Sequence, residues 1–350
     1  MRHTTLGRRS GLRVSEYGLG AGNFGTQWGT RATREESRLI FDRFAESGGT
    51  LIDTADGYQK GQSEEFLGEF LVADRDHFVV ATKYTQGAQG GDVSKTGNGR
   101  KNMVRSVEES LRRLRTDYID LYWVHHPDRI TPLDEILRGL DDLVSAGKIL
   151  HAGLSNFPAW RVAWASATAD LRGWTPVSAV QFEYSLVERT ADRELLPMAE
   201  ALGLGVALWS PLGGGLLTGK YRSSSAGRLT DWQRLVHTED TDQKTRVVDE
   251  VLAIAAEIDA RPAHVAMAWL RARGAASTTS SVPIVGPRNL VQLEDYLAAL
   301  DVDLDAKHVA RLDEVSAVSL GVPHEVGDSV HDSVLGGDAS RFLPRRGVVV

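Results

Sequence analysis

Four polar residues stand where apolar stretches end, and together they could protonate a carbonyl oxygen: Asp53, Tyr58, Lys83 and His125. A tyrosine that donates a proton near neutral pH needs its pKa, which is about 10 when unperturbed, lowered. A nearby ammonium group lowers this pKa because it stabilises phenolate, and a carboxylate beside the lysine keeps the lysine charged. A histidine within reach orients the substrate oxygen or relays the proton. The pattern therefore predicts a proton-transfer site built on Tyr58.

Each of these residues also has an ordinary structural explanation. An acid followed by a tyrosine is common in turns with a packed ring, and a lone lysine is usually salt-bridged. His125 and His126 suggest a metal, but neighbouring residues of a strand point to opposite faces, so their rings would not share one ion. We therefore expect no metal site. The catalytic interpretation depends on four suitable residues that follow three successive strands.

The elements that must position these residues alternate between strands and helices. After a hairpin over 4–15, apolar runs of strand length end near residues 20, 53, 83, 124, 154, 182, 208 and 285. Stretches with apolar residues at helical spacing separate most of them. Eight such units predict a (β/α)₈ TIM barrel, with the hairpin closing its bottom and a long loop after strand 7. We expect one domain over 1–350, with the barrel over about 16–300 and a C-terminal helix and polar tail over about 305–350.

Helix starts are predicted from residues that can cap an N-terminus. Thr33 and Ser63 are both followed by acids and are the best candidates. On the helix after Thr33, Leu39 is expected to point inward with its apolar neighbours. A later helix is expected from about Thr190. The tail after Ser316 is polar and rich in glycine, which predicts poor order.

Composition and charge exclude several classes of function. The 350 residues are 42% hydrophobic and 25% charged, as in an ordinary globular protein. The net charge is −7 without a Lys/Arg-rich block, so nucleic acid is not an expected partner. The absence of cysteine removes disulfides, zinc–thiolate sites and thiol catalysis. Without a signal-peptide core or an apolar run of membrane-spanning length, we expect a cytoplasmic protein with no membrane partner.

The second half of the chain carries groups suited to holding a dinucleotide. They stand at or after the ends of the last four strands: Ser155, Asn156, Gln181, Trp209 with Ser210–Gly215, Lys220, Gly286 and Arg288. Hydroxyl and amide groups suit the carboxamide of a nicotinamide ring, and a Gly-rich loop lets backbone N–H groups approach a pyrophosphate. An arginine at a helix start can hold a phosphate. A simple cap and an ordinary loop would explain the same residues.

Over nearly its whole length, from Leu6 to about Pro323, the chain resembles the aldo-keto reductase superfamily. The resemblance rests on these segments: Asp53–Tyr58, Ala81–Lys83, Asp120–His125, Gly153–Phe157, Trp209–Lys220 and Val285–Asn289. It implies that Asp53, Tyr58, Lys83 and His125 are the catalytic tetrad of that family. The residues of several segments are similar to those of bacterial reductases, including those that act on nucleotide-linked deoxysugars.

The resemblance also implies NADP(H) as cofactor. The implied contacts are Gly22, Asp53, Ser155, Asn156, Gln181, Trp209, Ser210, Pro211, Leu212, Gly214, Lys220, Gly286, Arg288, Gln292 and Asp295. Arg288 would contact the 2′-phosphate. Relatives usually have Glu-Asn near the adenine, whereas this chain has Asp295 and Tyr296, and a tyrosine cannot present an amide to the base.

The implied reaction is reduction of an aldehyde or ketone, keto-sugars included, with Tyr58 protonating the oxygen. The expected walls of the substrate pocket are Phe24, Trp28, Tyr58, Trp123 and His126. One rival is a Rossmann domain, since Gly20–Gly25 matches its fingerprint, but no helix is predicted directly after Gly25. Another rival is a non-catalytic NADP-binding subunit, because potassium-channel β-subunits resemble the same superfamily. The intact His125 favours an enzyme.

Overall fold

Eight parallel strands close into one barrel in the computed structural model, which describes residues 1–29, 31–88, 91–222 and 237–343. The strands in chain order are β3 Gly18–Gly20, β4 Leu51–Asp53, β5 Val79–Tyr84, β6 Ile119–Val124, β7 Ile149–Ser155, β8 Val177–Glu183, β9 Gly205–Trp209 and β10 Ser281–Val285. Each pairs with its neighbour in sequence, and β10 pairs with β3 to complete the ring. The (β/α)₈ prediction is confirmed, and the open sheet of a Rossmann domain is excluded.

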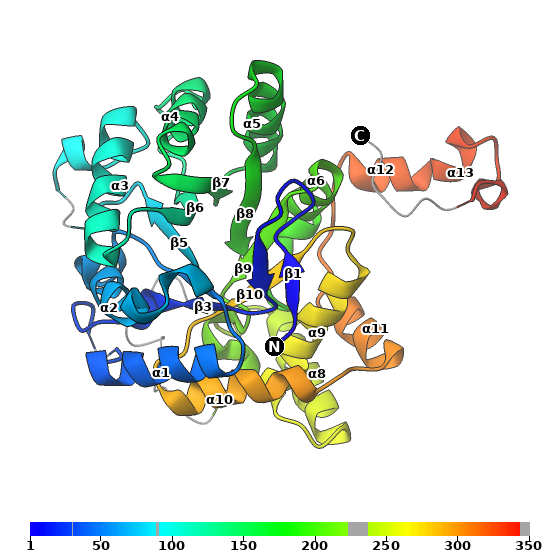
Figure 1. Ribbon diagram of the computed structural model, residues 1–350. Helices are drawn as coiled ribbons and strands as arrows, with labels where there is room; N and C mark the ends of the chain where they lie inside the picture. The colour runs from blue at the N-terminus through cyan, green and yellow to red at the C-terminus, as the bar shows by residue number, and fades with distance from the viewer. Residues whose placement is uncertain (30, 89–90, 223–236, 344–350) are drawn as a thin grey trace.

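Helices surround the barrel on the outside (Figure 1). Those that follow the first six strands are α1 Arg34–Glu46, α2 Gln62–Phe70, α3 Arg100–Leu114, α4 Leu133–Ser145, α5 Ala159–Arg172 and α6 Leu195–Leu202. The later helices are α8 Asp242–Glu257, α9 Pro262–Ala276, α10 Leu290–Ala298 and α11 Ala306–Val315. The spacing of α3 shows why such segments form helices here, because Met103, Val107, Leu111 and Leu114 recur at helical intervals and are all buried.

The predicted hairpin is present and covers the amino-terminal end of the barrel. It consists of β1 His3–Thr5 and β2 Arg13–Ser15, paired antiparallel. Leu6 and Val14 are buried against the side chains that fill the barrel interior, among them Trp123. Gly7 has a φ of +77°, and a Cβ there would lie 2.3 Å from the backbone nitrogen of Gly205. Only glycine therefore lets the hairpin approach the barrel this closely.

Several details of the helices differ from the sequence-based expectations. Thr33 does cap α1, since its hydroxyl accepts a hydrogen bond from the Glu36 N–H. Leu39, expected inward, is 53% exposed. Ser63 is not a cap, because α2 begins one residue earlier, after Gly61 in the left-handed conformation. The Ser63 hydroxyl instead donates to the backbone oxygen of Ala21 at 2.7 Å and so ties α2 to the end of β3.

The helix expected from about Thr190 begins later, and the C-terminal tail has structure of its own. Residues Thr190–Asp192 form a short 3-10 turn, and α6 begins only at Leu195. The polar tail after Ser316 contains the short helices α12 His324–Ser329 and α13 His331–Val334. Figure 1 shows them projecting from the barrel. Within the described ranges, no helix is both long and apolar enough to cross a lipid bilayer.

Candidate active site

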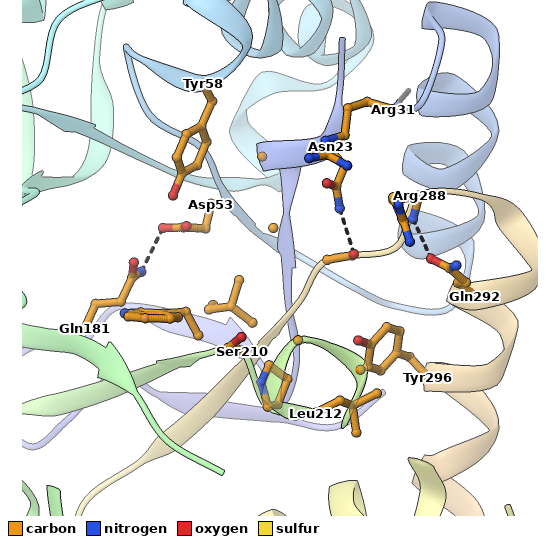
Figure 2. A pocket seen from close by; sticks show the side chains of 18 of the residues that line it. Asn23, Arg31, Asp53, Tyr58, Gln181, Ser210, Leu212, Arg288, Gln292 and Tyr296 are labelled. Carbon is orange, nitrogen blue, oxygen red and sulfur yellow. Dashed lines mark hydrogen bonds between the residues drawn. The ribbon is translucent and has the colours of Figure 1, made fainter. Parts of the chain in front are cut away.

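A pocket of about 560 Å³ lies at the carboxyl-terminal mouth of the barrel. Residues from both halves of the chain line it, and Figure 2 labels ten of them. Tyr58 and Asp53 lie at one end, with the Tyr58 hydroxyl directed toward Asp53. Arg288, Gln292 and Tyr296 lie at the other. The pocket is therefore elongated, with the predicted proton donor at one end and a cation at the other.

Lys83 is the centre of the charged cluster beneath Tyr58. Its side chain is fully buried, and its ammonium group donates to three oxygens. The acceptors are Asp53 Oδ2 at 2.5 Å, the backbone oxygen of Thr54 at 2.7 Å and Tyr58 Oη at 3.3 Å. All three N–H donors of the ammonium are thus satisfied, and the direction of the third fixes the phenol. The structure brings Asp53, Tyr58 and Lys83 together as predicted.

The pKa values in this cluster refine the prediction made for Tyr58. Burial lowers the pKa of Lys83, but the charge of Asp53 and the contact with Tyr58 outweigh it, so the Lys83 pKa is raised. Lys83 is therefore firmly cationic. For Tyr58, burial raises the pKa more than Lys83 lowers it, so the net direction is upward. The expected net depression of the Tyr58 pKa is wrong, because sequence alone does not reveal that the phenol is buried.

His125 and His126 stack on one another beside Tyr58. Their ring centroids are 4.4 Å apart with planes at 14°, and the Tyr58 ring meets His125 edge-on at 5.7 Å. The argument that they face opposite ways is wrong, because β6 ends at Val124 and strand alternation no longer applies. Burial and the nearby Lys83 charge lower the pKa of both histidines. Both are therefore neutral near pH 7, and the described residues contain no cluster suited to a metal.

Neutral side chains from β7, β8 and β9 form the middle of the pocket. Asn156 donates to His126 Nδ1 at 3.2 Å, and its oxygen accepts from Trp209 Nε1 at 3.2 Å. Gln181 donates to Asp53 Oδ1 at 3.0 Å, as Figure 2 shows. These bonds fix the amides of Asn156 and Gln181 in the positions where the sequence predicted a nicotinamide contact. Ser155, predicted with them, is fully buried with its hydroxyl 3.0 Å from the Asn156 amide nitrogen.

The loop after β9 runs along the pocket with its backbone exposed to it. The 3-10 segment Gly213–Thr218 contains Gly214 and Gly215, both with positive φ. The Tyr221 hydroxyl donates to the Gly214 oxygen at 2.9 Å and holds the turn in place. A Cβ on Gly215 would lie 3.0 Å from Lys220 Nζ, so the lysine packs directly against the glycine backbone. Ser210, Pro211, Leu212, Gly214 and Lys220, which the sequence predicts as cofactor contacts, all line the pocket. The predicted long loop continues beyond this segment, mostly over 223–236, which lie outside the described residues.

At the start of α10, backbone N–H groups that could bind an anion already donate to side chains of the protein. The Leu290 N–H donates to Glu36 Oε1, and the Gln292 N–H donates to the Asn289 side chain. The Arg288 N–H donates to Gln292 Oε1 at 2.9 Å. The side chains of Gln292, Glu36 and Asn289 therefore already satisfy these three amides. The Arg288 side chain still lines the pocket.

Asp295 and Tyr296, which stand where relatives usually have Glu-Asn, both line the pocket. Asp295 lines it, but one of its carboxylate oxygens accepts from Arg261 at 2.8 Å and lies 2.9 Å from His264 Nε2. Tyr296 lines the same end and presents a ring instead of an amide. This end therefore offers a flat aromatic surface beside Arg288.

Two aromatic residues predicted for the pocket belong to the core. Phe24 is fully buried and packs with the residues between barrel and helices, and Trp123 is buried inside the barrel against Gly153. Trp28 and His126 do line the pocket. Phe24 turns inward because its neighbours pair with Ala32, which closes the loop over it.

Sequence reasoning missed several residues of the pocket, notably Asn23, Arg31 and Gln86. Asn23 donates to the Gly286 backbone oxygen at 2.9 Å and so links the ends of the first and last barrel strands, β3 and β10. It follows β3 as Asp53 ends β4, so the strand-end rule applied to the first strand would have found it. Arg31 follows no strand, and no comparable signal marks it.

Comparison with known proteins gives a consistent result. The profile of the Aldo/keto reductase family matches residues 16–317. An uncharacterized oxidoreductase, YrpG, of Bacillus subtilis is 36% identical over 90% of this chain and 96% of its own length. The norsolorinic acid reductase stcV of Emericella nidulans is 35% identical over 92% and 83%, respectively. An aryl-alcohol dehydrogenase [NADP(+)] of Phanerodontia chrysosporium is 34% identical over 92% and 88%.

Proposed function

The chain belongs to the aldo/keto reductase family of oxidoreductases, and we propose that it reduces an aromatic aldehyde or ketone with NADPH, with Tyr58 as the proton donor. The observation that carries the proposal is the placement of Tyr58 Oη, 3.3 Å from the fully buried ammonium group of Lys83, which donates three hydrogen bonds. The non-catalytic alternative would explain the buried Lys83–Asp53 pair as structural, but it gives no role to the Tyr58 hydroxyl that faces the pocket beside it.

The proton transfer follows from the charges around Tyr58. As a carbonyl oxygen becomes an alkoxide it takes a proton from the phenol, and the phenolate left behind is stabilised by Lys83. Asp53 keeps Lys83 charged through their 2.5 Å contact. His125 is neutral and lines the pocket beside Tyr58, where it can donate a hydrogen bond to the substrate oxygen.

The pocket residues fit a dinucleotide. Asn156 and Gln181 would hold the carboxamide of the nicotinamide, and Trp209 would support its ring. Gly214 and Lys220 would bind the pyrophosphate, and Arg288 the 2′-phosphate. When bound, NADPH supplies the hydride. The preference for NADPH over NADH rests on Arg288 and on the NADP(+) in the name of the fungal aryl-alcohol dehydrogenase.

An aromatic substrate is favoured by the walls near Tyr58. Trp28 meets the Tyr58 ring edge-on at 6.2 Å, and His126 is stacked parallel to His125. These faces suit a planar ring better than a sugar, whose hydroxyl groups would need more polar partners. Relatives named norsolorinic acid reductase and aryl-alcohol dehydrogenase support the same substrate class.

The test is a screen of NADPH oxidation against matched carbonyl compounds. We expect substituted benzaldehydes and aryl ketones to be turned over at higher kcat/KM than aliphatic aldehydes of similar size or keto-sugars. A higher kcat/KM for keto-sugars would replace the aromatic substrate class with the deoxysugar one. NADPH binding without turnover of any carbonyl would support the regulatory-subunit alternative.

A further inference from the structure

One buried carboxyl near the active site has no cation of its own. The buried acids in the described part of the chain are Asp53, Asp56, Glu64 and Asp120. Asp53 bonds to Lys83, Glu64 to Arg113 and Asp120 to Arg75, each at 2.5–2.7 Å. Asp56 is 2% exposed and forms no such pair, and its Oδ1 has no hydrogen-bond partner among the described residues. A carboxylate in this position is destabilised relative to the neutral acid.

The groups that face Asp56 come from all elements packed against it. Glu64 on α2 raises the pKa of Asp56, whereas Arg113 and Arg105 on α3 lower it. A negative charge on Asp56 raises the pKa of Tyr84 on β5, of Tyr122 on β6 and of Tyr58 in its own loop. Both guanidinium groups are bonded to other carboxylates, Arg113 to Glu64 through Nε at 2.6 Å and Arg105 to Glu109 at 2.7 Å.

The backbone of Asp56 links this cluster to the proton donor. Its N–H donates to the backbone oxygen of Lys83 at 3.0 Å, and Tyr58 follows two residues later. Gln59, next in the loop, is tied to Gly22 and Trp28 by its side-chain amide. The Tyr58 loop is therefore anchored on both sides, and one anchor carries an unpaired acid.

We propose that Asp56 is a positioning residue that works in its neutral form, and that its ionisation above neutral pH weakens Tyr58 as a proton donor. Its effect on turnover rests on the proposed function, whereas its ionisation does not. An added negative charge next to the loop stabilises the phenol over the phenolate. Carbonyl reduction should then slow as Asp56 loses its proton.

The pH range follows from the surroundings of the group. Burial, and then the charge of Glu64, raise the pKa of Asp56 to about 7. An unfolded aspartate has a pKa of about 3.9, so the folded protein binds more protons between these two values. The contribution of Asp56 to stability is therefore present below the unfolded pKa and is lost as pH rises through the folded pKa.

The first experiment compares pH profiles of kcat/KM for carbonyl reduction in the wild type and in Asp56→Asn. We expect the wild-type rate to fall about three- to tenfold from about pH 6 to about pH 8, and the variant to lack this fall. In Glu64→Gln the inflection should move to lower pH, because Arg113 becomes available to Asp56. An unchanged inflection in Asp56→Asn would overturn the proposal.

The second experiment does not depend on turnover. The difference in Tm between Asp56→Asn and the wild type should increase in favour of the variant from about pH 5 to about pH 7.5, by at least ~3 °C. A constant difference would mean that Asp56 does not titrate there, and would refute the proposal even in an active enzyme. If the Tm difference changes as expected while no carbonyl is reduced, the proposed function fails and the titration of Asp56 stands.

Discussion

The two halves of the barrel hold their functional groups by different means. In the first half, Asp53 and Lys83 are charged and buried, and each is satisfied by side chains or backbone of neighbouring strands. In the second half, Asn156, Gln181 and Trp209 are neutral, and hydrogen bonds between side chains hold them in place. Asn156 and Ser210 both adopt positive φ, a conformation that side chains normally avoid.

This difference matches the roles that we propose for the two halves. Proton transfer needs a fixed electric field at one atom, and a buried ammonium with three acceptors provides it. Holding a large ligand needs directional bonds that can form and break repeatedly, which amides and backbone groups provide. Substitutions in the first half should therefore affect chemistry and folding, whereas those in the second half should affect affinity.

The largest effect should come from Tyr58→Phe. Loss of the hydroxyl removes the proton donor while leaving the ring and its packing, so kcat for carbonyl reduction should fall by about 10²–10⁴-fold. NADPH affinity, measured by fluorescence quenching, should stay within about twofold. Full turnover in this variant would remove Tyr58 from the mechanism.

Lys83→Met should impair folding as well as activity. Asp53 would keep a buried charge with Gln181 as its one remaining side-chain donor among the described residues, so we expect the free energy of unfolding to drop by about 3–5 kcal/mol. Urea denaturation measures this loss. The double variant Asp53→Asn with Lys83→Met is the matched control, because it removes both charges and should recover much of the stability while remaining inactive. Equal stability of single and double variants would contradict the assigned ion pair.

Arg288→Leu should change cofactor preference in the second half. We expect the Kd for NADPH to rise about 10- to 100-fold and that for NADH by less than about twofold, because only NADPH carries the 2′-phosphate. Lys220→Met is the control, since a pyrophosphate contact should weaken both cofactors alike. Equal losses in Arg288→Leu would place the arginine elsewhere on the cofactor.

The smallest effect is expected at Asn156, where two variants distinguish the role of the backbone conformation from that of the side-chain amide. Asn156 has a φ of +59°, which glycine adopts freely and alanine does not. Asn156→Ala should therefore be less stable than Asn156→Gly by about 1 kcal/mol, as measured by urea denaturation. Both should lose NADPH affinity to a similar extent, because both lack the amide. A normal affinity in the glycine variant would show that the amide is not a contact.

The barrel could be predicted because its signals are local and repeated. Each apolar run and its following helix were visible without knowledge of the rest, and closure followed from their number. The three residues at the ends of β4, β5 and β6 could be found because parallel strands place their ends at one mouth. Lys83 alone carries no functional signal, but it could be assigned to the site because Asp53 and His125 follow the neighbouring strands.

The errors arose where the outcome depends on contacts distant in sequence. Leu39 and Ile40 are equally apolar, yet only the packing of α1 decides which one faces inward. Ser63 has the chemistry of a cap, but its hydroxyl is bonded to Ala21, more than forty residues earlier. Phe24 resembles a pocket aromatic until the loop that buries it is known. The direction of the Tyr58 pKa likewise depends on burial, which no spacing reveals.

Asp53 joins the two halves through a single carboxylate. One oxygen receives the Lys83 ammonium and the other receives the Gln181 amide, so a displacement of either neighbour is transmitted to the other through a rigid planar group. If Gln181 also binds the nicotinamide, a shift of that ring would move Asp53 and, through Lys83, the Tyr58 hydroxyl. The rate of proton transfer from Tyr58 would then depend on Gln181. Solvent isotope effects in a Gln181 variant would record that mechanical link.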